Sequence, residues 1–174
     1  MSKSGKSCPV TREKFPLLPK LIATSFGVGF LPVAPGTWGA LLALLLWLPL
    51  YLYASIWVAF WLTLTATILY CIAGTWASTL SEKYWGKDPV VACADETVGQ
   101  WIALLPVVPL SAGVNATPWW CVILSFILFR AFDIWKPLGI RKLERLPGGV
   151  GMMADDIAAG ILAGFVIFLI NILY

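Results

Sequence analysis

Five of the nine acidic residues lie where an apolar segment of the sequence begins or ends. They are Asp95, Glu96, Asp133, Asp155 and Asp156. An ionised carboxylate at membrane depth is costly, and it usually marks a functional site or a paired contact. Carboxylate oxygens suit a hard cation such as Mg²⁺, which needs only a few of them and keeps several waters. The set therefore predicts a metal site.

Helix capping is a simpler explanation for part of this set. Acidic residues are favoured in the first turn of a helix, where they oppose the helix dipole, and Asp95 and Asp155 each precede a predicted helix. Asp133 instead lies near the end of a predicted helix, where a carboxylate is unfavourable unless Arg130 or Lys136 compensates it. Because caps leave Asp133 unexplained, we favour the metal site.

Two cations flank Asp133 in the sequence. Arg130, Asp133 and Lys136 follow at spacings of three, which places them near one face of a helix and combines a carboxylate with two groups that bind phosphate. An intrahelical ion pair is the alternative, especially for Lys136. Pro137 follows Lys136 and predicts that the helix ends there.

A glycine- and proline-rich segment leads into the first long apolar segment. Gly36 and Thr37 lie at this entry, directly after Pro35. Backbone N–H groups and a hydroxyl at a helix N-terminus form an anion site, so both residues are candidates for phosphate binding. A cap with close packing is the alternative.

Missing residue types remove several mechanisms. The chain contains no histidine, which excludes a Ser/His/Asp or Cys/His site within it. It also lacks a cysteine followed six positions later by arginine, a D-x-D motif, and the G-x-x-x-x-G-K-[ST] loop. The chemistry that remains is metal-assisted attack by a water on a phosphoryl group. An aspartyl-phosphate on Asp133 or Asp155 stays open as an alternative.

The composition is that of a helical membrane protein. Of the 174 residues, 60% are hydrophobic and 12% are charged, and the mean hydropathy is +0.86, whereas soluble domains carry about 25% charged residues. We predict an all-α, polytopic fold with about five transmembrane or partly re-entrant helices, within limits of four to six. The predicted spans are Trp38–Tyr53, Ser55–Ser78, Thr97–Leu110, Trp119–Ile134 and Ile157–Leu173.

Charge in the connecting segments predicts the orientation. The basic tail, residues 1–20, and the charged segments 82–96 and 136–156 fall on one side, whereas the connections 49–54 and 111–118 carry no charge. The positive-inside rule then places the tail and all of the acidic residues in the cytosol, with residues 21–174 as the membrane-embedded domain. The net charge of +3 is not gathered in a basic stripe, so nucleic acid is not an expected partner.

Four segments, in their order and spacing, resemble the phosphatidylglycerophosphatase A family. They are Gly27-x-Gly29 with Pro35-Gly36-Thr37-x-Gly39, Asp95-Glu96-x-x-Gly99, Phe129-Arg130-x-x-Asp133-x-x-Lys136-Pro137, and Gly151-x-x-x-Asp155-Asp156-x-x-Ala159-Gly160. Members of this family are Mg²⁺-dependent enzymes of the bacterial inner membrane. They hydrolyse phosphatidylglycerophosphate to phosphatidylglycerol and inorganic phosphate.

The resemblance implies a role for each candidate residue. The five carboxylates would form the catalytic centre, with Asp95, Glu96, Asp133 and Asp156 as ligands of Mg²⁺. Gly36, Thr37, Arg130 and Lys136 would bind the phosphate of a membrane phospholipid. The expected location is the inner membrane, with the active site facing the cytosol.

Two other classes of protein fit parts of the sequence. Carboxylates at helix ends are also found in small cation transporters and channels. An ion pathway, however, needs polar residues through the depth of the membrane. The central parts of the predicted spans offer mainly Thr63, Thr65, Thr67 and Ser125. A CDP-alcohol phosphotransferase is less favoured because its D-x-x-D-G-x-x-A-R signature is absent.

Overall fold

In the computed structural model, which describes residues 14–107 and 119–173, the regular elements are all helices. In chain order they are α1 (Leu17–Ala23), the 3₁₀ helix η1 (Val28–Phe30), α2 (Pro35–Tyr53), α3 (Ile56–Trp85), α4 (Ala94–Leu104), α6 (Trp119–Trp135), the 3₁₀ helix η2 (Pro137–Arg145) and α7 (Gly149–Leu173). The predicted all-α fold is therefore confirmed for this part of the chain.

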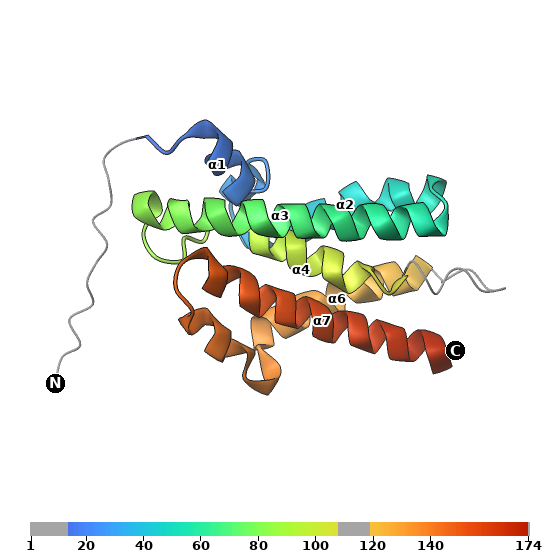
Figure 1. The fold of residues 1–174 in the computed structure, drawn as a ribbon. Coiled ribbons are helices and arrows are strands. Elements are labelled where there is room, and N and C mark those ends of the chain that lie inside the picture. The colour runs from blue at the N-terminus through green and yellow to red at the C-terminus, as the bar shows by residue number, and fades with distance from the viewer. Residues whose placement is uncertain (1–13, 108–118, 174) are drawn as a thin grey trace.

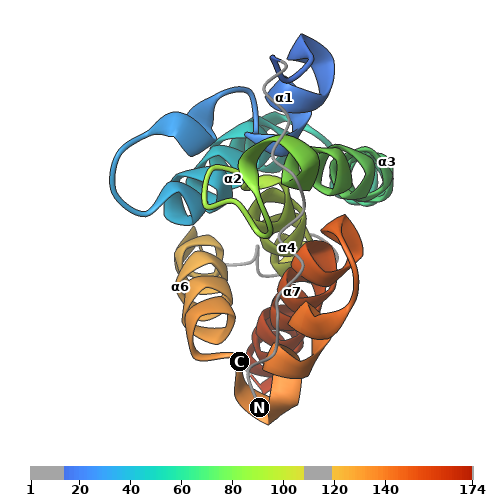
Figure 2. The same ribbon diagram turned by 90° about the vertical axis from the view of Figure 1, so that its left-hand side faces the viewer.

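Helices α2, α3, α4, α6 and α7 lie side by side, as Figure 1 shows. The short helix α4 lies at the centre, where it packs against α2, α3, α6 and α7 (Figure 2). Its side chains are accordingly mostly buried. The helix that carries Asp95 and Glu96 is thus enclosed by its neighbours rather than exposed to lipid.

Among the described residues, three helices are long and apolar enough to cross a membrane: α2, the part of α3 from Trp57 to Trp85, and α7. By contrast, α4 has 11 residues and α6 has 17. At 1.5 Å per residue α4 is about 16 Å long, roughly half of a hydrocarbon core. Residues 108–110 of the predicted third span and the predicted connection 111–118 lie outside the described residues, so the count of five stays a prediction.

Local sequence explains where most helices begin and end. Pro35 occupies the first turn of α2, where its missing N–H costs nothing. Pro137 ends α6 at Trp135, as predicted, and Lys136 takes a left-handed conformation there. Gly86 ends α3 with φ +91°, a conformation that favours glycine.

Several helix boundaries differ from the predicted spans: α3 continues past Ser78 to Trp85, and α4 begins at Ala94 rather than at Thr97. Helix α2 ends at Tyr53, as the predicted span does, but it continues through Pro49, so the uncharged connection is Ala54 and Ser55 rather than 49–54. A proline inside a helix removes one hydrogen bond, which an apolar helix packed against its neighbours tolerates. Helix α7 begins at Gly149 rather than after Asp156, because its glycine-rich first turn packs directly against α3: the N–H of Gly149 donates to Thr79 Oγ1 at 2.9 Å.

The charged segments gather at one end of the helices, as predicted. The starts of α2, α4 and α7 meet the ends of α3 and α6 there, at the end that faces the viewer in Figure 2. The segments 82–96 and 136–156 therefore lie together, and the site is built at this end.

Glycines let α4 approach its neighbours closely. A Cβ at Gly160 of α7 would lie 2.4 Å from the carbonyl oxygen of Gly99 on α4. A Cβ at Gly99 would in turn lie 2.4 Å from the ring of Phe129 on α6. Small residues allow this backbone contact between membrane helices, and here they draw three of the site-bearing helices together.

We expect Gly160→Ala to destabilise the protein by about 1–3 kcal/mol, because the added methyl overpacks a contact made by backbone atoms. Thermal unfolding in detergent measures this loss. Ala131→Leu is the control, since it adds more bulk at an exposed position of α6. Equal stability of Gly160→Ala and wild type would show that the helices are not in close contact.

Candidate active site

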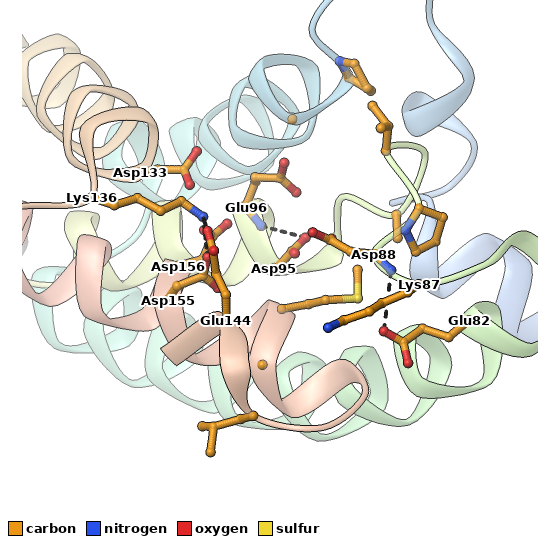
Figure 3. A pocket seen from close by; sticks show the side chains of 18 of the residues that line it. Glu82, Lys87, Asp88, Asp95, Glu96, Asp133, Lys136, Glu144, Asp155 and Asp156 are labelled. Atoms are coloured by element: carbon orange, nitrogen blue, oxygen red, sulfur yellow. Dashed lines mark hydrogen bonds and ion pairs between the residues drawn. The ribbon is translucent and has the colours of Figure 1, made fainter. Parts of the chain in front are cut away.

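A cavity of about 330 Å³ lies at the charged end of the helices (Figure 3). Its lining comes from the start of α2, the α3–α4 connection, α4, α6, η2 and α7. All five predicted catalytic carboxylates line it, as do three of the four predicted phosphate-binding residues, Gly36, Arg130 and Lys136. The fourth, Thr37, is half-buried and lies outside the lining.

Three carboxylates form the centre of the cavity. Asp95, Glu96 and Asp156 each place an oxygen so that the three oxygens lie within 4.8 Å of one another. Asp95 and Asp156 are only 8% and 3% exposed. Glu96 Oε2 and Asp156 Oδ2 are buried and have no hydrogen-bond partner among the described residues. Buried carboxylate oxygens without donors are costly unless a cation balances them.

Helix capping does not account for this cluster. Asp156 lies seven residues beyond Gly149, the first residue of α7, so it is not in the first turn. Asp95 and Glu96 are in the first turn of α4, where the helix dipole favours them, but no side chain caps that helix at its N-cap. Asp95 Oδ1 accepts a hydrogen bond from the adjacent N–H of Glu96 at 3.2 Å. The two acidic pairs therefore come together by tertiary packing.

Gly36 gives the cluster its room on the side of α2. A Cβ at this position would lie 2.0 Å from Glu96 Oε1 and 3.3 Å from Arg130 Nη2. Only a glycine therefore allows the Glu96 carboxylate and the Arg130 guanidinium to meet at the N-terminus of α2. Close packing at Gly36 was the alternative to phosphate binding that the sequence analysis kept.

Arg130 and Asp133 pair with each other on α6. Arg130 Nη1 lies 2.7 Å from Asp133 Oδ2, but this contact lacks hydrogen-bond geometry, and Arg130 Nε also has no partner among the described residues. The intrahelical pair explains how Asp133 is tolerated near the end of a helix. Asp133 faces the cavity without belonging to the group of three, and Arg130 keeps donors free for an anion.

Lys136 reaches across to another helix instead of pairing with Asp133. Its Nζ donates to Asp155 on α7 and, at 2.6 Å, to Glu144 Oε1 on η2. Burial by itself would lower the pKa of Lys136, but these hydrogen bonds and the nearby carboxylates outweigh it and raise the pKa. Lys136 therefore stays positively charged at neutral pH, and it ties the end of α6 to α7 and η2.

Sequence reasoning missed several residues of the cavity. Glu144 contacts Lys136, although it follows Lys136 by eight residues and by no helical spacing. Glu82, Lys87 and Asp88, from the end of α3 and the segment after it, also line the cavity. In the sequence, these three residues were indicated only by the charge of segment 82–96, which we used solely to predict orientation.

Comparison with known proteins supports an assignment to a family. The family model for phosphatidylglycerophosphatase A matches residues 21–171. A phosphatidylglycerophosphatase A of Escherichia coli is 33% identical over 158 residues, covering 87% of this chain and 82% of its own length. The Haemophilus influenzae protein of the same name is 36% identical over 153 residues, covering 87% of each chain.

A third relative carries a different name. A protein of Bacteroides thetaiotaomicron named "Putative phosphatidylinositol-3-phosphatase" is 49% identical over 144 residues, covering 83% of this chain and 87% of its own. No solved structure matches the chain.

The fold and the site define a helical membrane protein with a carboxylate-rich polar cavity at one end of its helices. The chain belongs to the phosphatidylglycerophosphatase A family, whose model spans most of its length. It is therefore a phosphatase.

We expect Gly36→Ala to reduce phosphate release by about a hundredfold, because its methyl displaces the Glu96 carboxylate and small misplacements in a site have effects of this size. Phosphate release from lipid phosphomonoesters measures the loss. The unfolding temperature in detergent should stay near that of wild type, since the clash involves the end of a side chain. Full activity in Gly36→Ala would show that the close contact between Gly36 and Glu96 is not needed.

Proposed function

We propose that this chain hydrolyses phosphatidylglycerophosphate to phosphatidylglycerol and phosphate, using Mg²⁺ held by Asp95, Glu96 and Asp156. The observation that carries the proposal is the group of three carboxylates, with oxygens within 4.8 Å of one another and with buried oxygens that lack donors. Hard oxygen ligands in this number suit Mg²⁺, which completes its shell with water and phosphate oxygens.

The chain's own residues divide the remaining tasks. Arg130 keeps guanidinium donors free, so it binds the oxygens of the substrate phosphomonoester. Lys136 adds a second positive charge, and Asp155 and Glu144 position it. A dication at the three carboxylates would polarise the phosphoryl group and lower the pKa of a nearby water. Asp133, the expected fourth ligand, lines the same cavity and stays a predicted ligand.

The carboxylate that orients the attacking water is Asp155, which lies outside the group of three. Asp155 Oδ1 is buried and has no hydrogen-bond partner among the described residues, whereas its Oδ2 accepts from Lys136. A carboxylate with one anchored oxygen and one free oxygen is suited to accept a proton from an attacking water. The aspartyl-phosphate route through Asp133 or Asp155 is the alternative mechanism.

The substrate we favour is the one named for two of the relatives. The third relative is named for phosphatidylinositol 3-phosphate, which also presents a phosphomonoester on a lipid headgroup. An assay that offers each lipid alone distinguishes between these two possible substrates. Faster release from phosphatidylglycerophosphate supports our choice, and release from phosphatidylinositol 3-phosphate alone would replace it.

A cation channel fits the described core less well. Thr63 and Thr67 donate their hydroxyl groups to carbonyls of their own helix, at 2.7 Å each, and so offer little to a passing ion. Below the cavity the core continues with apolar side chains, among them Phe129, Ala159 and Ala163. The charged groups of the described residues are thus concentrated at one end, as hydrolysis at a membrane surface requires. We place that surface at the cytosolic face of the bacterial inner membrane, in keeping with the charge asymmetry.

We expect purified protein in detergent to release phosphate from phosphatidylglycerophosphate with Mg²⁺ and to lose this activity in EDTA. Asp156→Asn should lower the rate at least about a hundredfold, because it removes one ligand charge while preserving shape. Glu82→Gln is the matched control: this carboxylate lies at the rim and accepts a weak hydrogen bond from the N–H of Asp88. Metal-independent release, or equal loss in both variants, would contradict the proposal.

A further inference from the structure

A second hollow, of about 470 Å³, adjoins the catalytic cavity on the side of η2. We call it the basic hollow because four cations line it: Lys87, Arg141, Lys142 and Arg145. Two carboxylates, Asp88 and Glu144, also face it. Three of the four cations come from η2, and Lys87 comes from the segment between α3 and α4, so two distant parts of the chain build the hollow together.

The cations of the basic hollow differ from those of the catalytic cavity. Arg130 and Lys136 each have a carboxylate partner. In the part of the chain that the structure describes, no salt bridge engages the four cations of the basic hollow, and all four are exposed. One of the two carboxylates, Glu144, already pairs with Lys136. The hollow therefore has an excess of positive charge that an anion would balance.

The two hollows lie next to each other. Lys87, Asp88 and Glu144 line both of them. Glu144 accepts a hydrogen bond from Lys136, which also donates to Asp155 beside the carboxylate cluster. An anion among the arginines of η2 would therefore lie beside the catalytic cavity, across the Lys136–Glu144 pair.

We infer that the basic hollow binds the phosphodiester of the lipid headgroup while the phosphomonoester occupies the catalytic cavity. The inference rests on the proposed function, because the favoured substrate carries these two phosphates joined by one glycerol. Arg141 and Arg145 supply planar, permanently charged groups that bind phosphate oxygens in pairs. The hollow would thereby select headgroups that carry a second phosphate.

Positive charge in a cytosolic loop also has a simpler origin, in the rule that sets membrane orientation. Such charge needs only to be present in the loop and would attract any anionic surface. A phosphodiester subsite instead requires that the cations bind one particular group of the bound substrate. The two explanations separate when the substrate is a short-chain phosphatidylglycerophosphate in nonionic micelles that contain no other anionic lipid.

The test compares Arg141→Gln/Arg145→Gln with wild type under these conditions. The KM for the short-chain substrate should rise about tenfold with kcat within about twofold, because charge-assisted contacts to the phosphodiester are lost while the reacting groups remain. The inhibition constant of inorganic phosphate, which enters the catalytic cavity alone, should not change. Lys87→Gln, on a different segment, should raise KM in the same direction.

The matched control is Lys14→Gln/Lys83→Gln, which removes two exposed charges outside the hollow. An unchanged KM in both double variants overturns the inference and leaves the proposed function intact. Equal increases in KM and in the inhibition constant of phosphate also overturn it, since they indicate a general loss of positive potential. A wild type that releases no phosphate from this lipid would instead refute the proposed function.

Discussion

Carboxylates that are buried together repel one another, and each also loses its hydration. Asp95, Glu96 and Asp156 meet under these conditions at the centre of the cavity, with oxygens that no protein donor satisfies among the described residues. A surrounding chain that holds the carboxylates firmly and a cation that balances their charge would both stabilise such an arrangement. The rest of the fold can be understood as the means by which that arrangement is held.

Close helix packing supplies the rigid support. The carboxylates belong to α4 and α7, which approach each other through Gly99 and Gly160, while Gly36 of α2 leaves room for Glu96. Because α4 is surrounded by its neighbours, its first turn cannot move toward water to relieve the repulsion. Two cations beside the cluster then balance part of its negative charge. Arg130 pairs with Asp133, and Lys136, directly after α6, pairs with Asp155.

The sequence allowed the helical fold and most of the residues that line the candidate site to be predicted, because long apolar segments and acidic residues beside them are local signals. The sequence placed Asp155 and Asp156 before a helix, whereas α7 begins at Gly149. The glycines of this first turn have a low helix propensity, so the helix start that tertiary packing stabilises was not predicted. The sequence also grouped Lys136 with Asp133 by spacing, but the contact with Asp155 joins residues from different helices. Glu144 and the basic hollow depend on how η2 folds back toward α7, which residue spacing does not encode.

Binding of Mn²⁺, observed by electron paramagnetic resonance on detergent-solubilised protein, tests the central claim most directly because it reports on the metal site without turnover. We expect wild type to bind Mn²⁺, Mg²⁺ to displace it, and Glu96→Gln to weaken binding while the fold is retained. Glu82→Gln should bind as wild type does. Equal binding of Mn²⁺ by wild type and Glu96→Gln would contradict the assignment of the three carboxylates as a metal site.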